Sequence, residues 1–146
     1  MEFHKILIAI DNNPSSELVA LSGLQLAQQY HSEIALISIP EADSSIDYDP
    51  PTQKEEDDMM EHNLNANQLR VIEKVFKDYP VKSFVAKGVP YKVIIETAEE
   101  WGADIIVMGT HGRKGLPHLL LGSVAEDVIR HSKRTLVVIP VIDSLK

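Results

Sequence analysis

Short apolar runs alternate along the chain with longer segments in which apolar residues recur every three or four positions. Apolar runs cover residues 6–10, 34–39, 105–108 and 136–141, and residues 81–86, which include Lys82 and Ser83, are a further short strand candidate. An uninterrupted apolar run of this length is typical of a strand in a parallel sheet, because such a strand is buried on both faces. The pattern therefore predicts five strands.

The segments between these runs carry the periodicity of helices. A first helix is predicted to reach about Tyr30, with an apolar stripe made by Leu18, Ala20, Leu21, Leu24 and Ala27. A second is predicted over residues 54–76, with a stripe made by Met60, Leu64, Leu69, Ile72 and Phe76. A third is predicted from Pro90 to about Trp101, and a fourth from about Ser123 to His131. Residues 40–51 are predicted to form a polar loop, which is long enough to suggest a function.

This regular alternation predicts an α/β fold, in which a parallel sheet is covered on both faces by right-handed crossover helices. A length of 146 residues favours one domain that spans residues 1–146. The sequence has no cysteine, which excludes disulfides and thiolate chemistry. The first residues do not resemble a secretory signal, and the apolar runs are too short to span a bilayer. We therefore expect a cytoplasmic protein with no membrane partner.

The formal net charge is −8, and much of the acidic excess lies between Glu41 and Asp58. This cluster is interpreted as a solvated loop and helix start rather than a metal site, because it lacks the central glycine of a calcium-binding loop. An acidic chain is repelled by nucleic acid unless its basic residues cluster. The basic residues Arg113, Lys114, Arg130, Lys133 and Arg134 are split between two segments, so we expect no nucleic-acid partner.

Glycines are concentrated late in the chain, where four of the seven lie within fourteen residues: Gly109, Gly112, Gly115 and Gly122. Gly109 follows the predicted fourth strand, and Gly122 directly precedes the last helix. Glycine has no side chain, so its backbone can adopt positive φ and its N–H group can approach an anion closely. A helix start adds unpaired N–H donors. This segment therefore predicts a phosphate-binding loop. It is not a Walker A loop, because no Gly-Lys-Ser/Thr follows four residues after a glycine. It is not a dinucleotide fingerprint either, because that motif has its glycines within six residues after the first strand.

The order Gly109-Thr110-His111-Gly112, nine further residues, and Gly122-Ser123 resembles the Gly-x2-Gly-x9-Gly-(Ser/Thr) pattern of the nucleotide-binding branch of the universal stress protein family. The resemblance continues through Asp11 at the end of the first strand and through Gly88-Val89-Pro90 before the third helix. It implies a Rossmann-like fold, similar to the adenine nucleotide alpha hydrolases, with a five-stranded sheet in the order 3-2-1-4-5. In such a sheet, ligands bind at the carboxyl ends of the strands where the winding direction changes, here strands one and four.

The resemblance also implies a nucleotide site. Backbone groups of the glycine loop and the Ser123 hydroxyl would hold phosphates, Asp11 would face the ribose or adenine, and Ile39 would offer backbone groups to adenine. The residues assigned to the site are Ala9, Ile10, Asp11, Ile39, Met108, Gly109, Thr110, His111, Gly112, Arg113, Gly122, Ser123, Val124 and Ala125. The sequence departs from the family pattern at Asp11-Asn12-Asn13, where Asp-Gly-Ser is usual, and at Ser38-Ile39-Pro40, where a His-Val pair is common.

Structural roles compete with several of these assignments. Ser123 and Glu126 have the spacing of a capping box, in which the hydroxyl serves the helix itself. Asp11 is equally compatible with a turn that bonds its own backbone, and His111 with an exposed loop position. No catalytic residue and no protein metal site are assigned.

The expected ligand is ATP, or alternatively AMP or ADP, with Mg²⁺ or Mn²⁺ held through the phosphates. The expected function is a nucleotide-dependent regulatory switch in the stress response. The alternatives are a slow ATP hydrolase and a dimeric interaction module that binds no nucleotide. The apolar run from Leu136 to Ile139 would lie at a sheet edge, so we expect a homodimer through it. The alternative is that Pro140 and the C-terminal tail protect this edge within one chain.

Overall fold

The structure is a computed structural model that describes residues 2–11, 15–39, 66–110 and 122–141. The predicted loop at 40–51, the first part of the predicted second helix and residues 111–121 of the glycine loop lie outside these ranges. The elements are β1 (Lys5–Ile10), α1 (Ser16–Tyr30), β2 (Glu33–Ser38), β3 (Val81–Val85), α3 (Pro90–Trp101), β4 (Ile105–Gly109), α4 (Ser123–His131) and β5 (Thr135–Ile139). Residues 66–75 are also helical.

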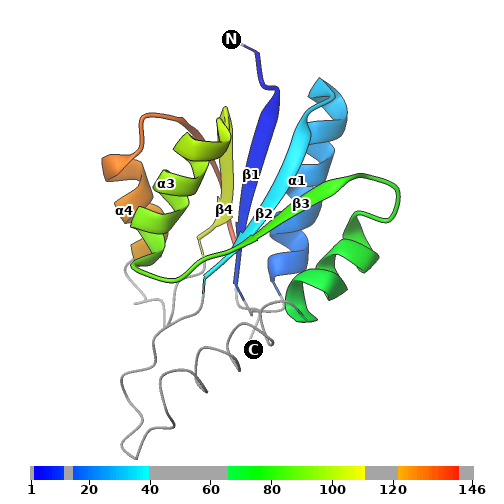
Figure 1. Ribbon diagram of the computed structural model, residues 1–146, viewed down its shortest axis with the longest axis horizontal. Coiled ribbons are helices and arrows are strands. Elements are labelled where there is room, and N and C mark those ends of the chain that lie inside the picture. Colours follow the sequence, from blue (N-terminus) through cyan, green and yellow to red (C-terminus); the bar gives the residue numbers. More distant parts are fainter. Residues whose placement is uncertain (1, 12–14, 40–65, 111–121, 142–146) are drawn as a thin grey trace, which may run out of the picture.

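The five strands form one parallel sheet in the order β3-β2-β1-β4-β5, which confirms the predicted order (Figure 1). In the centre, Ile6 of β1 pairs with Ile34 of β2 on one side and with Ile105 of β4 on the other. The chain winds away from β1 in opposite directions before and after α3. The carboxyl ends of β1 and β4 are therefore neighbours at the edge of the sheet where α1 and α4 begin.

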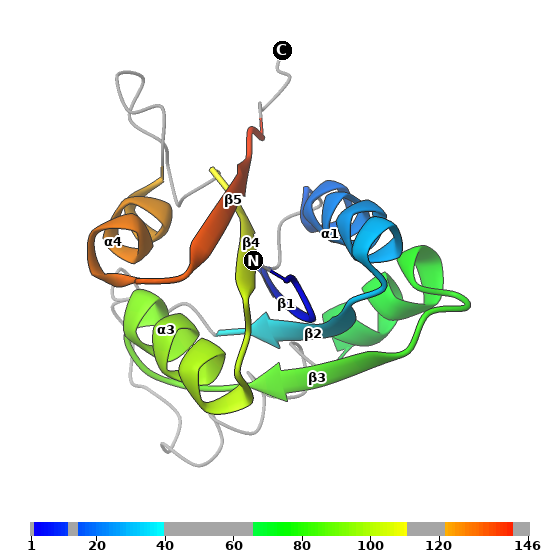
Figure 2. The ribbon, with the colours of Figure 1, turned by 90° about the horizontal axis from the view of Figure 1, so that it is seen from above.

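Helices cover both faces of the sheet, as predicted. Figure 2 shows α1 and the helical segment 66–75 on one face, and α3 and α4 on the other. Alternate residues of β1 serve the two layers: Ile6 and Ile8 pack towards α1, and Leu7 packs towards α3. All three side chains are fully buried, which fits a central parallel strand without a polar face.

Local chemistry explains where the helices end. The residue after α1, His31, has a left-handed backbone with φ of 55°, and its N–H donates to the carbonyl of Ala27. Gly102 ends α3 in the same way with φ of 83°, a conformation that glycine adopts without steric cost. Pro90 occupies the first turn of α3, where its missing N–H leaves no helical bond unmade.

The buried face of α1 agrees only in part with the predicted stripe, since Ala20, Leu24 and Ala27 are buried as predicted. Leu18 and Leu21 are 48% and 42% exposed, whereas Val19, Gly23 and Ala27 face the sheet. Small residues lie on the buried side of α1 at Ala20, Gly23 and Ala27, and Leu24 is buried with them. In the segment 66–75, Leu69 is likewise 58% exposed, and Gln68 and Val71 are buried in its place.

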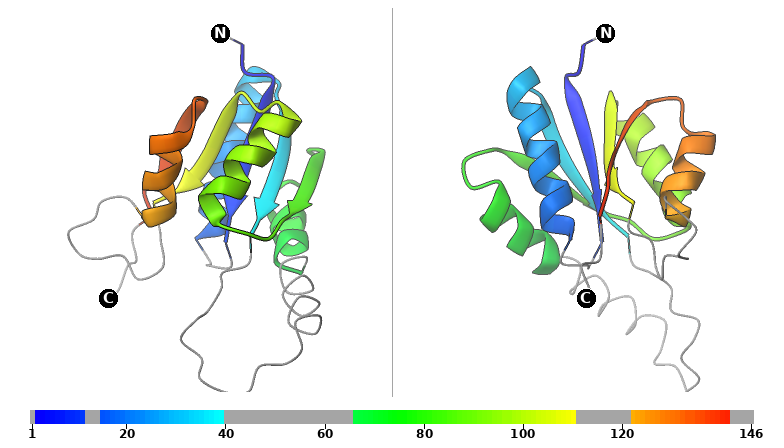
Figure 3. Two further views of the ribbon diagram at one scale, coloured as in Figure 1. Left: turned by 60° about the vertical axis from the view of Figure 1, so that its left-hand side comes forward. Right: turned by 180° about the vertical axis from the view of Figure 1, so that it is seen from behind.

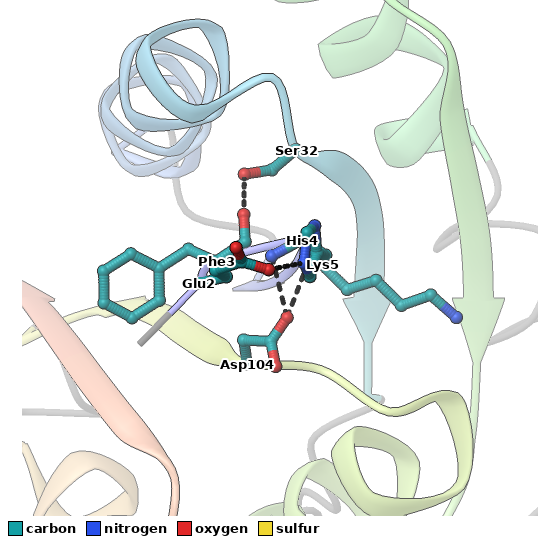
Figure 4. A network of polar contacts seen from close by, with 6 residues as sticks. All are labelled: Glu2, Phe3, His4, Lys5, Ser32 and Asp104. Atoms are coloured by element: carbon teal, nitrogen blue, oxygen red, sulfur yellow. Dashed lines mark hydrogen bonds and ion pairs between the residues drawn. The ribbon is translucent and has the colours of Figure 1, made fainter.

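The amino ends of β1 and β4 are joined by Asp104, the residue just before β4. Its carboxylate Oδ2 accepts hydrogen bonds from the backbone N–H groups of His4 (2.8 Å) and Lys5 (3.0 Å), and its own N–H donates to the carbonyl of Lys5 (Figure 4). On the other side of β1, the Ser32 hydroxyl donates to the carbonyl of Phe3. These bonds fix the start of β1 between its two neighbours.

No helix within the described ranges is both long and apolar enough to cross a membrane.

Candidate nucleotide-binding site

A cavity of about 310 Å³ opens where β1 and β4 end. Its position is the switch point of the sheet, which is where open α/β folds bind ligands. Ten of the fourteen predicted site residues line it: Ala9, Ile10, Asp11, Ile39, Met108, Gly109, Gly122, Ser123, Val124 and Ala125. Of the other four, Thr110 is not a lining residue, and His111, Gly112 and Arg113 lie outside the described residues.

One wall of the cavity is the first turn of α4. Gly122 is the N-cap and is buried, and the turn continues through Ser123, Val124 and Ala125. The first N–H groups of a helix have no partner within the helix, and the helix dipole adds partial positive charge at the same point. This wall therefore offers several donors and a favourable potential to an anion.

The capping-box interpretation of Ser123 is wrong. Ser123 is the first residue of α4, and the N-cap is Gly122, which has no side chain with which to cap the helix. The N–H of Glu126 donates to the carbonyl of Gly122 at 3.0 Å, and its carboxylate pairs with Arg130 one turn further on, also at 3.0 Å. The hydroxyl of the exposed residue Ser123 is therefore not the N-terminal cap of its own helix.

Positive φ is not found at the two loop glycines that the structure describes, Gly109 and Gly122, and Gly112 and Gly115 lie outside the described residues. Gly122 has φ of −70°, and the described glycines with positive φ are Gly88 and Gly102. Gly109 instead is short of space, because a Cβ there would lie 3.0 Å from Val19 Cγ2 and 3.1 Å from Val141 Cγ2. The requirement at Gly109 is therefore close packing rather than an unusual backbone conformation.

Thr110 anchors the cavity from behind. Its N–H donates to the carbonyl of Ile139 at 3.0 Å, and its hydroxyl oxygen accepts from the N–H of Val141 at 2.9 Å. These two bonds extend the β4–β5 pairing beyond the strands. They hold Val141 in the cavity wall, next to Gly109.

Another part of the lining is apolar and comes from β2 and α3. Ile39 and Ile37 contribute from β2 and its end, and Pro90 and Ile94 from the first turns of α3. Sequence reasoning missed seven of the lining residues, which come from the start of α1, from β2, from α3 and from the chain after β5: Ser15, Ser16, Val19, Ile37, Pro90, Ile94 and Val141. The available signal was the parallel sheet itself, since Pro90 and Ser16 begin helices at the same edge that bears Asp11 and Gly109.

Asp11 lies at the boundary between these walls. It is half-buried, and its backbone carbonyl accepts a hydrogen bond from Asn67 Nδ2 at 2.9 Å. Next to Asn67, the buried amide of Gln68 donates from Nε2 to Ser38 Oγ (3.0 Å) and to the carbonyl of Phe84 (2.9 Å). The segment 66–75 thus holds the carboxyl ends of β1, β2 and β3 together.

No group of three or more His, Cys, Asp or Glu side chains that could hold a metal ion is found among the described residues.

Comparison with known proteins gives the same assignment from sequence and from structure. Residues 2–140 match the model of the universal stress protein family. Universal stress protein MJ0531 of Methanocaldococcus jannaschii is 30% identical over 132 residues, which cover 89% of this chain and 78% of that protein. Universal stress protein MJ0577 of the same organism is 40% identical over 75 residues, which cover 50% of this chain and 46% of that one. The match therefore spans about half the length of MJ0577.

Solved structures show the same fold at lower sequence identity. Universal stress protein UspA from Lactobacillus plantarum superposes with a TM-score of 0.80 at 19% identity, covering 95% of this chain and 99% of that one. A universal stress protein in complex with cAMP gives 0.73 at 22% identity, covering 99% and 100%. The universal stress protein from Archaeoglobus fulgidus in complex with dAMP gives 0.64 at 20% identity, covering 94% and 98%. The family match over residues 2–140 and the 30% identity with MJ0531 show that the chain belongs to the universal stress protein family.

Proposed function

We propose that the cavity binds an adenine nucleotide, with the phosphates at the first turn of α4 and the base against the apolar wall. The observation that carries this proposal is the meeting of an anion-binding helix start and an apolar wall in one cavity at the sheet's switch point. Two proteins of the same fold, described above, were solved with cAMP and with dAMP. Both ligands carry a phosphate and adenine, which are the two groups that these walls suit.

The proposal gives each lining residue a role. The N–H groups of Val124 and Ala125 and the hydroxyl of Ser123 would donate to phosphate oxygens. Ile39 and Ile94 would contact adenine, and the carboxylate of Asp11 would accept from a ribose hydroxyl. Gly112, His111 and Arg113, which precede α4 in the chain, are proposed to complete the phosphate site.

ATP is the proposed physiological ligand, with Mg²⁺ or Mn²⁺ held mainly by its phosphates. We infer a regulatory role, in which the nucleotide shifts the balance between two conformations that differ in affinity for it. Hydrolysis would need a residue that orients water, and the described lining residues offer the Asp11 carboxylate for that task. Slow turnover of bound ATP would therefore test the hydrolase alternative.

The decisive variant is Ser123→Glu. Ser123 is exposed, and a carboxylate in the first turn of a helix is favoured by the helix dipole, so the variant should fold. The new carboxylate would occupy the phosphate position and repel the ligand. We expect ATP to bind the parent protein in the micromolar range and to bind Ser123→Glu about 30-fold or more weakly in titration calorimetry.

Gln25→Glu is the matched control. Gln25 is exposed on α1 and does not line the cavity, and its replacement adds the same charge. ATP affinity should stay within about twofold of the parent, because Gln25 does not line the cavity and salt screens exposed charges. Equal losses in both variants, or no binding by the parent, would contradict the proposed site. Product release measured in the same samples separates a switch from a hydrolase.

A further inference from the structure

The connection between β1 and α1 contributes both of its ends to the cavity. Ile10 and Asp11 line the cavity before the connection, and Ser15 and Ser16 line it afterwards. This side of the cavity is therefore set by how firmly the two ends are held. A ligand that must order a loose wall gives up part of its binding free energy in doing so.

Three side chains outside the cavity join the two ends. Asn67 Nδ2 donates to the carbonyl of Asp11 at 2.9 Å, and Asn67 Oδ1 accepts from Arg70 Nη2 at 2.7 Å. Arg70 Nη1 then lies 3.6 Å from Oε1 of Glu17, in the first turn of α1. The path runs from the end of β1, across the segment 66–75, to the start of α1. Figures 1 and 3 both show this segment beside the end of α1 that lies at the cavity edge of the sheet.

The Asn67 amide is the centre of this path because it uses both of its ends. Its oxygen is held by the guanidinium, which leaves the NH₂ group directed at the carbonyl of Asp11. A hydrogen bond to the Asp11 carbonyl also restrains the peptide plane that follows Asp11. This restraint limits the directions in which the Asp11 side chain can leave the backbone. Neither Asn67, Arg70 nor Glu17 lines the cavity, so none of them is expected to contact the ligand.

We propose that Asn67, Arg70 and Glu17 are positioning residues that hold Asp11 and the first turn of α1 in place and so set the affinity of the cavity for adenine nucleotides. This inference rests on the proposed function. It adds a part of the chain that the family's glycine pattern does not contain, because the path enters through the segment 66–75. It also gives that segment a role beyond covering the sheet.

Lys74 provides an internal control for the ion pair. Its Nζ lies 3.1 Å from Oε2 of the same Glu17 carboxylate, nearer than Arg70, but within the described part of the chain it makes no hydrogen bond with Asn67. Arg70→Met and Lys74→Met each remove one positive charge and one partner of Glu17. Both side chains are mostly exposed, so both variants should fold. Only Arg70→Met releases the Asn67 amide.

The test measures ATP affinity by calorimetry and amide hydrogen exchange of residues 15–19 in the ligand-free protein. Arg70→Met and Asn67→Leu should each weaken ATP binding about three- to tenfold, which corresponds to the loss of one ordinary hydrogen bond. Both should speed exchange at residues 15–19 relative to α4. Lys74→Met should leave affinity and exchange within about twofold of the parent, as is usual for exposed ion pairs.

Equal effects of Arg70→Met and Lys74→Met would overturn the proposal, because the Glu17 ion pair alone would then explain them. Faster exchange without a loss of affinity would also overturn it. If the parent binds no adenine nucleotide, the proposed function fails instead. The exchange comparison would still decide, in that case, whether Arg70 and Asn67 hold the connection.

Discussion

Tyr79 shows how a single polar group can fix the end of an element. Its hydroxyl donates to the carbonyl of Ser32 and lies 3.4 Å from the carbonyl of Ala27, the residue that also accepts the N–H groups of His31 and Ser32. The ring is half-buried against the same core layer as α1. The phenol therefore ties the turn after α1 to the chain that leads into β3.

Burial raises the pKa of the Tyr79 phenol above its ordinary value of 10.0. The folded protein then keeps a proton that the unfolded chain releases as the pH passes that value. Since the unfolded state binds fewer protons in this window, stability falls as pH rises through the ordinary pKa towards the raised one. Below the ordinary value, the contribution of Tyr79 is fully present.

Tyr79→Phe should lower the free energy of unfolding by about 0.5–1.5 kcal/mol at neutral pH, because the two carbonyls lose their donor. The difference between parent and variant should shrink between about pH 8 and about pH 10.5, where the parent pays for keeping the phenol protonated. Urea unfolding at both pH values checks this, and comparison with the variant cancels the titration of the lysines. A difference that grows with pH would contradict the assigned direction.

At the scale of elements, the packing of α1 on β1 depends on Gly23. An added Cβ at this position would lie 2.3 Å from Ile8 Cδ1 and 2.8 Å from Ile8 Cγ1. Ile8 is fully buried in the core cluster, so its side chain has little space into which it could move. The helix and the strand thus approach more closely than any side chain larger than hydrogen allows.

Gly23→Ala should destabilise the protein by about 1–2 kcal/mol, because overpacking outweighs the gain in helix propensity. Ile8→Val alone should cost about 0.5–1.5 kcal/mol through the lost methyl group. The double variant should lose less free energy of unfolding than the two single variants lose together, because valine lacks the Cδ1 atom that meets the new methyl. Chemical denaturation of all four proteins gives the interaction energy, and strict additivity would show that the helix simply moves away.

The same elements show what the sequence could and could not predict. Buried parallel strands are read from short apolar runs, and each predicted strand lies within about two residues of an observed one. The buried face of α1 was predictable only in part: Ala20, Leu24 and Ala27 are buried as the stripe predicts, but Gly23 carries little apolar signal although it forms the contact with β1. Leu18 has a strong apolar signal and yet faces outward.

The cavity was predictable as far as it follows local motifs. Gly109 and Gly122 mark it because they flank a strand end and a helix start, and the resemblance to a family supplied the base side through Ile39. Ile94 and Val19 were not accessible to such reasoning, since they reach the cavity only through the packing of whole helices on the sheet. The hydrogen bond from Asn67 to Asp11 joins residues 56 positions apart and has no local signature.

At the scale of the whole molecule, β5 lies at one end of the sheet (Figure 3). It pairs with β4 on one side, and no strand of the described residues pairs with its other side. Its four apolar residues remain half-exposed, in contrast to the buried apolar residues of β1 and β4. A bare edge of this kind is prone to pair with another chain, and a two-fold pairing closes it. We therefore propose a homodimer through the strand that runs from Leu136 to Ile139.

Val138→Lys should separate the dimer into monomers, because a charge in the middle of the edge opposes a second copy of the strand. Val138 belongs to neither buried core cluster, so the fold should tolerate the change better than it would at Val137 or Leu136. Leu18→Lys is the matched control, since it places the same charge on an exposed apolar residue of α1, a helix separate from this strand. Sedimentation velocity should give a dimer for the parent and for Leu18→Lys and a monomer for Val138→Lys.

A parent that sediments as a monomer would instead support protection of the edge within one chain. If all three proteins remain dimeric, the contact between subunits must use another surface, and β5 would then need a different explanation for its half-exposed apolar residues.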